Sequence, residues 1–182
     1  FIDNHDEARI YGELQDLNKL KVALTWLYTM RGIPCTYYGT EILMKETKDH
    51  GVIRQPFPGG WPGDAVDKFD YQNLSADEKE AQDLMRQLLA LRKTSGALKQ
   101  GGMKHFIPEN EVYAYFRYTE NETIMVVANV HPTEARELDL NRFREMWPVF
   151  SEGYDLIENK TLYGSENLPL APMSARVIRI KR

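Results

Sequence analysis

The sequence predicts an α/β segment followed by an all-β segment, with the boundary near Gly96. Two observations come from the residues before Gly96, where apolar side chains recur at helical spacing in two stretches and a β-favouring run lies between them. The third comes from the residues after Gly96, where strand-length pieces with alternating apolar residues are separated by turn residues. We therefore expect two domains, residues 1–95 and residues 96–182.

The first segment reads as a strand, a helix and a second strand. Helical periodicity predicts a helix from about Asp16 to Arg31, with Gly32 as a stop signal. The run "IPCTYYG" that follows suggests a short buried strand from Cys35 to Tyr38. If "FID" at residues 1–3 is an earlier strand, the three elements form a βαβ unit.

A long loop and a second helix complete the α/β segment. Periodicity is lost from Thr40 to Leu74, and "PFPGGWPGD" concentrates proline, glycine and aromatic residues. Loops of this length are usually functional or disordered, and the aromatic residues favour function. "SADE", which begins at Ser75, has the sequence of a capping box, so a helix is expected from about Ala76 to Thr94.

The last segment has the pattern of a β-sandwich. Apolar residues alternate at Val112, Ala114 and Phe116, and a more continuous apolar run covers residues 124–130 after a turn at residues 120–121. "SARVIRIKR", near the end of the chain, alternates again. We expect residues 96–182 to fold independently, whereas residues 1–74 should depend on their surroundings.

The composition argues against several classes of partner. The 182 residues include 23 basic and 27 acidic side chains without a basic run, which disfavours nucleic acid. No apolar run approaches the ~20 residues of a membrane span. Cys35 is the single cysteine, so an internal disulfide is excluded. No His/Cys cluster or Asp-Gly calcium loop is visible, so no metal or other cofactor is expected in this chain.

The opening stretch "FIDNHDEARI" concentrates polar chemistry behind a predicted strand. Asn4, His5, Asp6 and Arg9 would lie where a parallel strand ends, which is where α/β sheets and barrels carry ligands and catalysis. A carboxylate beside an imidazole and a carboxamide suits the recognition of neighbouring hydroxyl groups. The alternative is a polar turn or helix cap, because Asp and Asn favour both.

Two motifs in order resemble one family. "FIDNHD" resembles the signature that ends the seventh barrel strand of the α-amylase family of glycoside hydrolases, and "GIPCTYYGTE" resembles its eighth-strand motif. The loop "RQPFPGGWPGD" is similar to that of the neopullulanase and cyclomaltodextrinase branch. The resemblance implies that residues 1–95 are the last elements of a catalytic (β/α)8 TIM barrel, from the end of strand 7 to helix 8. Residues 96–182 would be a carboxyl-terminal antiparallel β-sandwich, and the chain would be the carboxyl-terminal part of a larger enzyme.

The resemblance also implies roles for the opening residues. Asp6 matches the family's third catalytic carboxylate, which binds sugar hydroxyls and favours an oxocarbenium-like ring. His5 matches a histidine that hydrogen-bonds the same ring, and Asn4 would orient Asp6. The nucleophile and the acid/base of such retaining enzymes come from strands four and five, outside this chain. The isolated chain is therefore expected to be inactive.

Two loop residues are further substrate-binding candidates. The family often carries an Asp and an Arg four residues apart after strand eight, where they hold a donor-side sugar. Here Asp49 and Arg54 are five apart, and Pro56 replaces an expected acidic residue, so Arg54 is the stronger candidate. Trp61 could stack on a sugar face, and packing the loop down is an equal alternative.

The function implied is retaining hydrolysis of α-1,4-glucosidic bonds in starch-derived glucans, namely maltooligosaccharides, cyclodextrins or pullulan. The alternatives are a non-catalytic glycan-binding or structural module and an amylase-like scaffold without catalysis. The expected partner is an α-glucan oligosaccharide or polysaccharide, and a homodimer remains open. Calcium would be bound only in regions outside this chain. The branch favours the cell envelope, periplasmic or secreted, over the cytoplasm.

Overall fold

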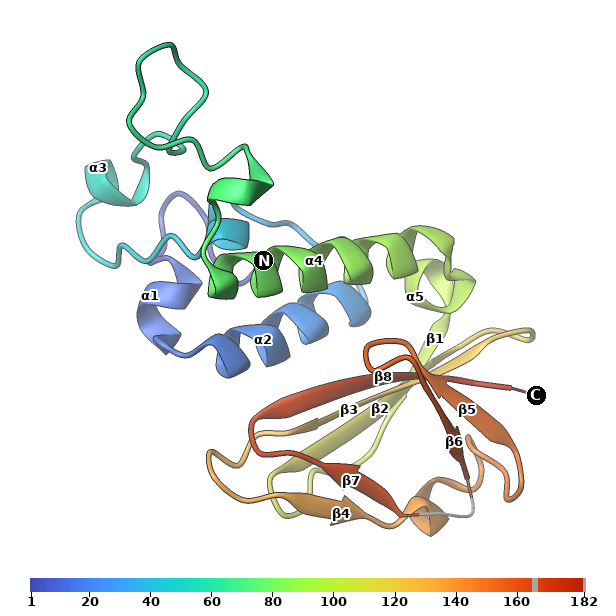
Figure 1. Ribbon diagram of the computed structural model, residues 1–182. Helices are drawn as coiled ribbons and strands as arrows, with labels where there is room; N and C mark the ends of the chain where they lie inside the picture. Colours follow the sequence, from blue (N-terminus) through green and yellow to red (C-terminus); the bar gives the residue numbers. More distant parts are fainter. Residues whose placement is uncertain (165–166, 182) are drawn as a thin grey trace.

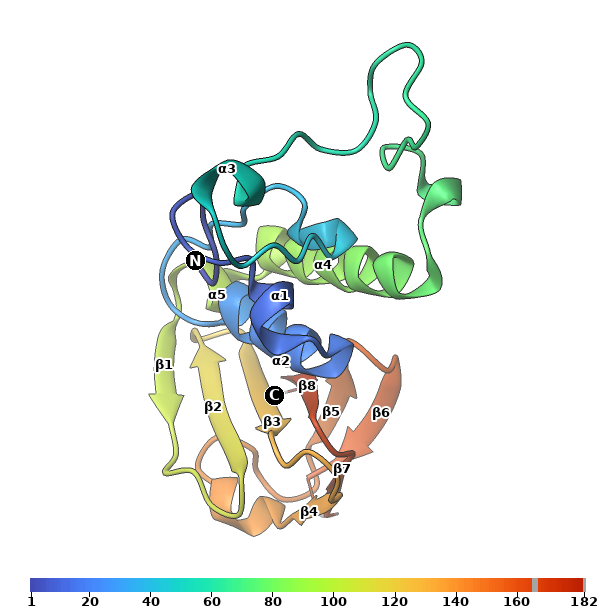
Figure 2. The ribbon, with the colours of Figure 1, turned by 90° about the vertical axis from the view of Figure 1, so that its left-hand side faces the viewer.

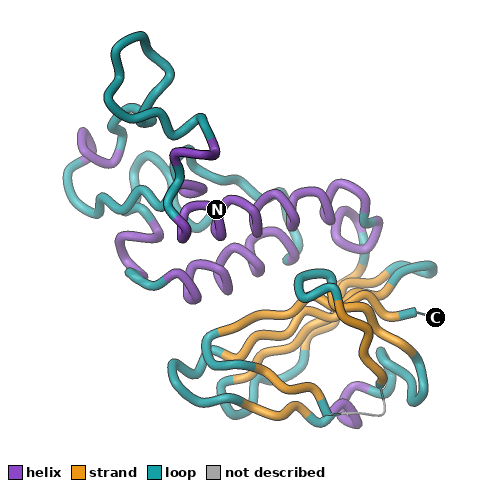
Figure 3. The backbone as a smooth tube through the Cα atoms, in the orientation of Figure 1, coloured by secondary structure: helices purple, strands orange, loops and turns teal. Residues whose placement is uncertain are grey.

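A helical layer covers one face of a large antiparallel sheet, and a small second sheet lies against the other face (Figure 1). The computed structural model describes residues 1–164 and 167–181. Helices α1 to α5 precede the strands along the chain, and the helical turn η3 lies between β4 and β5. Figure 3 shows the helices in purple and the strands in orange as separate layers. The helices and helical turns are α1 (Ile10–Leu14), α2 (Leu17–Thr29), η1 (Thr40–Ile42), α3 (His50–Ile53), η2 (Tyr71–Asn73), α4 (Ala76–Thr94), α5 (Gly96–Gln100) and η3 (Leu140–Phe143).

The two predicted long helices are confirmed, because their signals are local. Asp16 caps α2 by accepting the backbone N–H of Lys19 at 2.9 Å. The capping box of α4 is complete: Ser75 Oγ accepts from the backbone N–H of Glu78, whose carboxylate accepts from the Ser75 backbone N–H at 2.7 Å. Helix α4 has the predicted bounds, and α2 lies within its predicted range.

The two strands predicted in the first segment are not formed. Residues 1–3 and the segment from Cys35 to Tyr38 have no strand assignment, and Cys35 is exposed. An extended segment becomes a strand only through ladder hydrogen bonds to a neighbour, and β-favouring residues do not supply that neighbour. The strand prediction is therefore wrong for these residues in this structure.

The predicted loop from Thr40 to Leu74 is long, but it contains three short helical turns, η1, α3 and η2. Part of it projects beyond the helical layer, away from the sheets (Figures 1 and 2). Its base is fixed by a small core of Ile42, Met44 and Leu74, against which Phe57 packs. The loop is thus anchored at both ends.

All named strand pairs are antiparallel. In the part of the chain that the structure describes, one sheet has the order β1-β2-β3-β8-β5-β6 and the other pairs β4 with β7. The predicted hairpin is β2–β3, with Tyr118 opposite Thr123. The strands are β1 (Gly102–His105), β2 (Val112–Tyr118), β3 (Thr123–Asn129), β4 (Arg136–Leu138), β5 (Glu152–Asp155), β6 (Lys160–Tyr163), β7 (Leu168–Leu170) and β8 (Ser174–Ile180).

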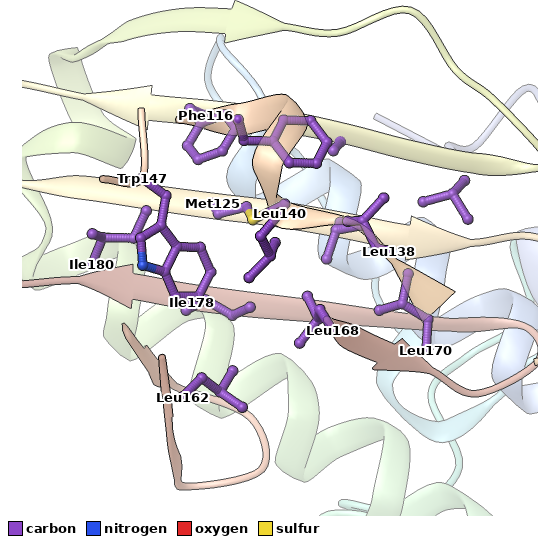
Figure 4. Packing of buried hydrophobic residues seen from close by; sticks show 14 residues of the cluster. Phe116, Met125, Leu138, Leu140, Trp147, Leu162, Leu168, Leu170, Ile178 and Ile180 are labelled. Atoms are coloured by element: carbon purple, nitrogen blue, oxygen red, sulfur yellow. The ribbon is translucent and has the colours of Figure 1, made fainter. Parts of the chain in front are cut away.

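The large sheet is buried on both faces along β3. Met125 and Val127 belong to the core between the two sheets, which Figure 4 shows with Trp147 among its side chains. Ile124 and Val126 belong to a second core that faces the helices. This double burial explains why the sequence is continuously apolar here instead of alternating.

The two predicted domains share that second core, which contains residues of α2, α4, β2, β3 and β8. Polar contacts reinforce it at the carboxyl end of α2. Arg117 on β2 donates to the carbonyl oxygen of Thr29 at 2.7 Å, and the hydroxyl groups of Tyr115 and Thr29 lie 2.5 Å apart. Arg92 on α4 donates to the carbonyl of Tyr28 at 2.8 Å. The boundary near Gly96 stays a prediction.

Candidate functional site

The opening polar stretch folds as a tight turn that Asn4 organises. Asn4 Oδ1 accepts the backbone N–H groups of Asp6, at 2.7 Å, and Glu7, at 3.1 Å. Just before it, the buried carboxylate of Asp3 accepts the Thr40 hydroxyl at 2.9 Å and the backbone N–H of Ile10 at 3.3 Å. Asn and Asp favour such turns because their side chains replace a backbone acceptor. The backbone under Asp6 is thereby fixed on both sides.

Three charged or polar groups meet above this turn. Arg54 Nη2 lies 2.7 Å from Asp6 Oδ1, and His5 Nε2 lies 3.1 Å from Asp6 Oδ2. Arg54 Nε also donates to the His5 carbonyl oxygen at 2.9 Å. The Asp6 side chain is 59% exposed, so these contacts contribute little to stability.

A buried arginine ties this turn to the second motif. Arg9 is fully buried, and its guanidinium lies over the rings of Tyr37 and Tyr38, 4.1 and 4.7 Å from their centroids. Arg9 Nε donates to the carbonyl of Ile53 at 3.1 Å, and Arg9 Nη1 donates to the carbonyl of Tyr38. Partial burial, followed by contact with Tyr38, raises the pKa of the Tyr37 phenol, which stays neutral at physiological pH. The two sequence motifs are thus joined through Arg9.

The structure brings four of the five predicted site residues together: Asn4, His5, Asp6 and Arg54. Trp61 stands apart on the projecting loop, 77% exposed. Among the described residues, Trp61 makes none of the polar or ring contacts that join the other four; its backbone N–H donates to Asp64 at 3.0 Å. The roles assigned to all five residues stay predictions.

Other loop residues have local structural contacts. Asp49 caps α3 by accepting the backbone N–H of Gly51 at 2.8 Å. Phe57 packs on Phe69, with ring centroids 4.4 Å apart, so this aromatic residue holds the loop down. Sequence reasoning gave Arg9 no role of its own. Its place in the polar opening stretch was the one available signal, since its partners lie 29 and 44 residues away.

The described residues include no group of three or more His, Cys, Asp and Glu side chains that could hold a metal ion. In the same part of the chain, no helix is long and apolar enough to cross a bilayer. The side chains above the turn supply a carboxylate with an imidazole and a guanidinium beside it. Such a group can accept hydrogen bonds from hydroxyl groups and stabilise positive charge.

Family profiles match both segments of the chain. The profile described as the alpha amylase catalytic domain covers residues 1–113, which is more than half of the chain. The profile described as the cyclo-malto-dextrinase C-terminal domain covers residues 103–179.

Curated relatives are much longer than this chain. Alpha-amylase 2 of Dictyoglomus thermophilum is 27% identical over 187 residues, which cover 98% of this chain and 28% of the relative. The maltogenic alpha-amylase of Bacillus acidopullulyticus is 29% identical over 133 residues, which cover 70% of this chain and 20% of the relative. The chain thus spans about a quarter of the length of these relatives.

Solved structures share the fold. An alpha-amylase from Geobacillus thermoleovorans, complexed with acarbose, superposes with a TM-score of 0.75 at 22% identity, over 100% of this chain and 38% of its own. A maltogenic amylase from S. marinus gives 0.74 at 19% identity, over 97% of this chain and 21% of its own. These matches confirm the predicted fold class, the last elements of a (β/α)8 barrel followed by an antiparallel β-sandwich. The chain belongs to the α-amylase family.

Proposed function

We propose that the protein carrying this chain is a retaining glycoside hydrolase that cleaves α-1,4-glucosidic bonds in starch-derived glucans. The observation that carries the proposal is that the Asp6 carboxylate is exposed and does not serve as the cap of its own turn. Its carboxylate does not cap the turn, because Asn4 accepts the backbone N–H groups there. Asp6 is instead exposed beside His5 and Arg54, in a chain of the α-amylase family.

Asp6 would act on the ring that is being cleaved. An ionised carboxylate accepts hydrogen bonds from sugar hydroxyls, and its charge favours the oxocarbenium-like transition state over the neutral ground state. The His5 imidazole would hydrogen-bond the same ring, and Asn4 would hold Asp6 through its turn. Retention also needs a nucleophile and an acid/base, which the resemblance assigns to barrel strands outside this chain.

The substrate class rests on the relatives. The Geobacillus enzyme was solved with acarbose and an AmyP variant with maltotriose. Maltooligosaccharides, cyclodextrins and pullulan are therefore the substrates to test. Trp61, exposed on the projecting loop, stays a candidate for stacking on a more distant sugar. A homodimer also stays a prediction, which analytical sedimentation can test.

Kinetics of Asp6→Asn in the whole protein test the proposal. The carboxamide keeps the size of the side chain and can still hydrogen-bond, but it lacks the charge that faces a cationic ring. We expect kcat to fall by roughly two to four decades, with a smaller change in KM. His5→Ala should change both constants, because a hydrogen bond to a hydroxyl group is made in ground and transition states alike. Thermal melts would control for unfolding.

The alternatives predict other outcomes. A glycan-binding or structural module would bind maltotriose without releasing reducing sugar, and a scaffold without catalysis would do neither. A near-wild-type kcat for Asp6→Asn would remove Asp6 from the mechanism. This chain alone should release no reducing sugar, because the two other carboxylates would be absent. We also propose a cell-envelope location, periplasmic or secreted, which fractionation can distinguish from the cytoplasm.

A further inference from the structure

We propose that Arg54 is a positioning residue for Asp6, whose guanidinium fixes the direction of the Asp6 carboxylate instead of holding a sugar itself. This inference rests on the proposed function for its catalytic consequence. The geometry is independent of it: Arg54 Nη2 lies 2.7 Å from Asp6 Oδ1, and Arg54 Nε donates to the His5 carbonyl at 2.9 Å. Two nitrogens of one planar guanidinium are thus engaged by the turn itself.

Hydrogen bonds to the residues on either side of Arg54 fix the position of its backbone. The carbonyl of Ile53, the residue before it, accepts Arg9 Nε at 3.1 Å, and the Ile53 side chain is buried. The carbonyl of Gln55, the residue after it, accepts the Tyr38 hydroxyl at 2.6 Å. Arg9 belongs to the opening stretch "FIDNHDEARI", and Tyr38 belongs to the second sequence motif. The opening stretch and the second motif therefore fix the backbone on both sides of Arg54, which contacts Asp6 as His5 does.

The planar guanidinium of an arginine can donate from two nitrogens to two acceptors at once, and this arrangement explains why position 54 carries an arginine. Asp6 Oδ1 faces Arg54 and Asp6 Oδ2 faces His5, 3.1 Å from its Nε2, so each carboxylate oxygen has a neighbour. A lysine ammonium is a single point and would reach either Asp6 or the His5 carbonyl with one short contact. Arg54 links the carboxylate to the backbone of the preceding residue, which limits rotation of the Asp6 side chain. Reacting groups that are held in this way lose less entropy in the transition state.

The pair can be tested in this chain without any activity. The exchange of the Arg54 Nη protons with water is followed by ¹⁵N–¹H spectroscopy in the wild type and in Asp6→Asn, because Nη2 is the atom that contacts Asp6. We expect the exchange to become several-fold faster in the variant, because the guanidinium is released from its charged partner. Arg86, which bonds the neutral Gln82 on α4, is the matched control and should not change. Equal exchange of Arg54 in both proteins would overturn the proposed contact.

A double-mutant cycle in the whole protein tests the consequence. Arg54→Met should lower kcat by about 10- to 100-fold with little change in KM, since misplacing a reacting group costs rates of this order. In the Asp6→Asn background the same substitution should change kcat less than about 3-fold, because the group it positions is gone. Residual turnover is measured with an activated aryl maltoside. Arg54→Lys should recover part of kcat, and Arg86→Met should resemble the wild type.

The outcomes separate the two proposals. If Arg54→Met raises KM equally in both backgrounds, Arg54 holds a sugar and the positioning role is refuted. If the wild-type protein has no glycosidase activity, the proposed function fails. In that event the exchange experiment alone decides whether Arg54 holds Asp6.

Discussion

Asn4 supplies the side-chain acceptor that caps the opening turn. By accepting the backbone N–H groups of Asp6 and Glu7, it caps the turn, and the Asp6 carboxylate faces His5 and Arg54. Sequence reasoning could select Asn4, His5 and Asp6, because adjacent polar residues after an apolar run are visible. It could not assign the cap, since both Asn and Asp favour that position and only the fold shows which one accepts.

At this scale we predict that Asn4→Ala lowers the free energy of unfolding of this chain by about 1 kcal/mol, the usual cost of losing such a local acceptor. Asn4→Asp keeps an acceptor oxygen in place and should lose less than half of that. Urea unfolding followed by circular dichroism measures both. Equal losses for Ala and Asp would mean that the hydrogen bonds to Asp6 and Glu7 do not stabilise the turn.

Among the elements, α4 was the easiest to predict and the strands of the first segment the hardest. The signals of α4 are local: Ser75 and Glu78 are three residues apart, and apolar residues follow at helical spacing. The predicted strand from Cys35 to Tyr38 needed a neighbour, which is not a property of its own residues. The short helix α5 was missed because its cap, Ser95, follows directly on the end of α4.

The end of the long loop is fastened to α4 through Glu78. Lys68 Nζ lies 2.7 Å from Glu78 Oε2, and both side chains are largely buried. Burial by itself raises the pKa of Glu78, but hydrogen bonds from Lys68 and Ser75 outweigh it, and the net pKa lies below the ordinary 4.5. A carboxyl with a depressed pKa stabilises the fold above its unfolded pKa. That stability is lost as the pH falls through the folded pKa.

We therefore predict that Glu78→Gln destabilises the chain by about 1 kcal/mol at neutral pH, the scale of one charge-assisted hydrogen bond. The difference from the wild type should shrink below pH 4.5 and disappear at lower pH, where Glu78 is protonated. Denaturant unfolding at a series of pH values measures it. Glu80→Gln, at an exposed ion pair with Lys21, is the control and should cost less. A difference independent of pH would contradict the assignment to Glu78.

At the scale of the whole molecule, the two predicted domains meet through a common core. The signal for this was present in the continuous apolar run of β3, which is typical of a strand buried on both faces. The apolar run indicates that the outer face of the sheet is buried, but it does not identify the elements that pack on that face. Only the fold shows that α2 and α4 lie there, with Leu20 and Leu24 of α2 in the same core as Ile124 and Val126.

This shared core changes what we expect of hydrogen exchange. Residues 1–74 were expected to depend on their surroundings, and the sheet supplies part of those surroundings for α2. We predict that the amides of α2 and of β2–β3 exchange through openings of similar free energy, because these elements unfold as one cooperative unit. The loop between α3 and η2 should exchange faster. Rapid exchange of α2 beside a protected sheet would instead make the two segments independent.

Arg117 is the residue through which that coupling can be broken. Its buried guanidinium on β2 donates to the carbonyls of Thr29, Gly101 and Gly102 at 2.7, 3.1 and 3.2 Å. Arg117→Met fills much of the same volume but leaves these carbonyls without their donor. We expect a loss of about 2–3 kcal/mol in unfolding free energy, the cost of leaving buried acceptors unsatisfied.

The matched control is Arg179→Met on β8, which removes a half-exposed ion pair with Glu122 and should cost no more than about 1 kcal/mol. Hydrogen exchange on the Arg117 variant then distinguishes two forms of coupling. If α2 and the sheet unfold together, the protection of both falls by the same amount, because one global opening exposes all of their amides. If only α2 loses protection, the helix opens separately from the sheet and the shared core does not make the chain one cooperative unit.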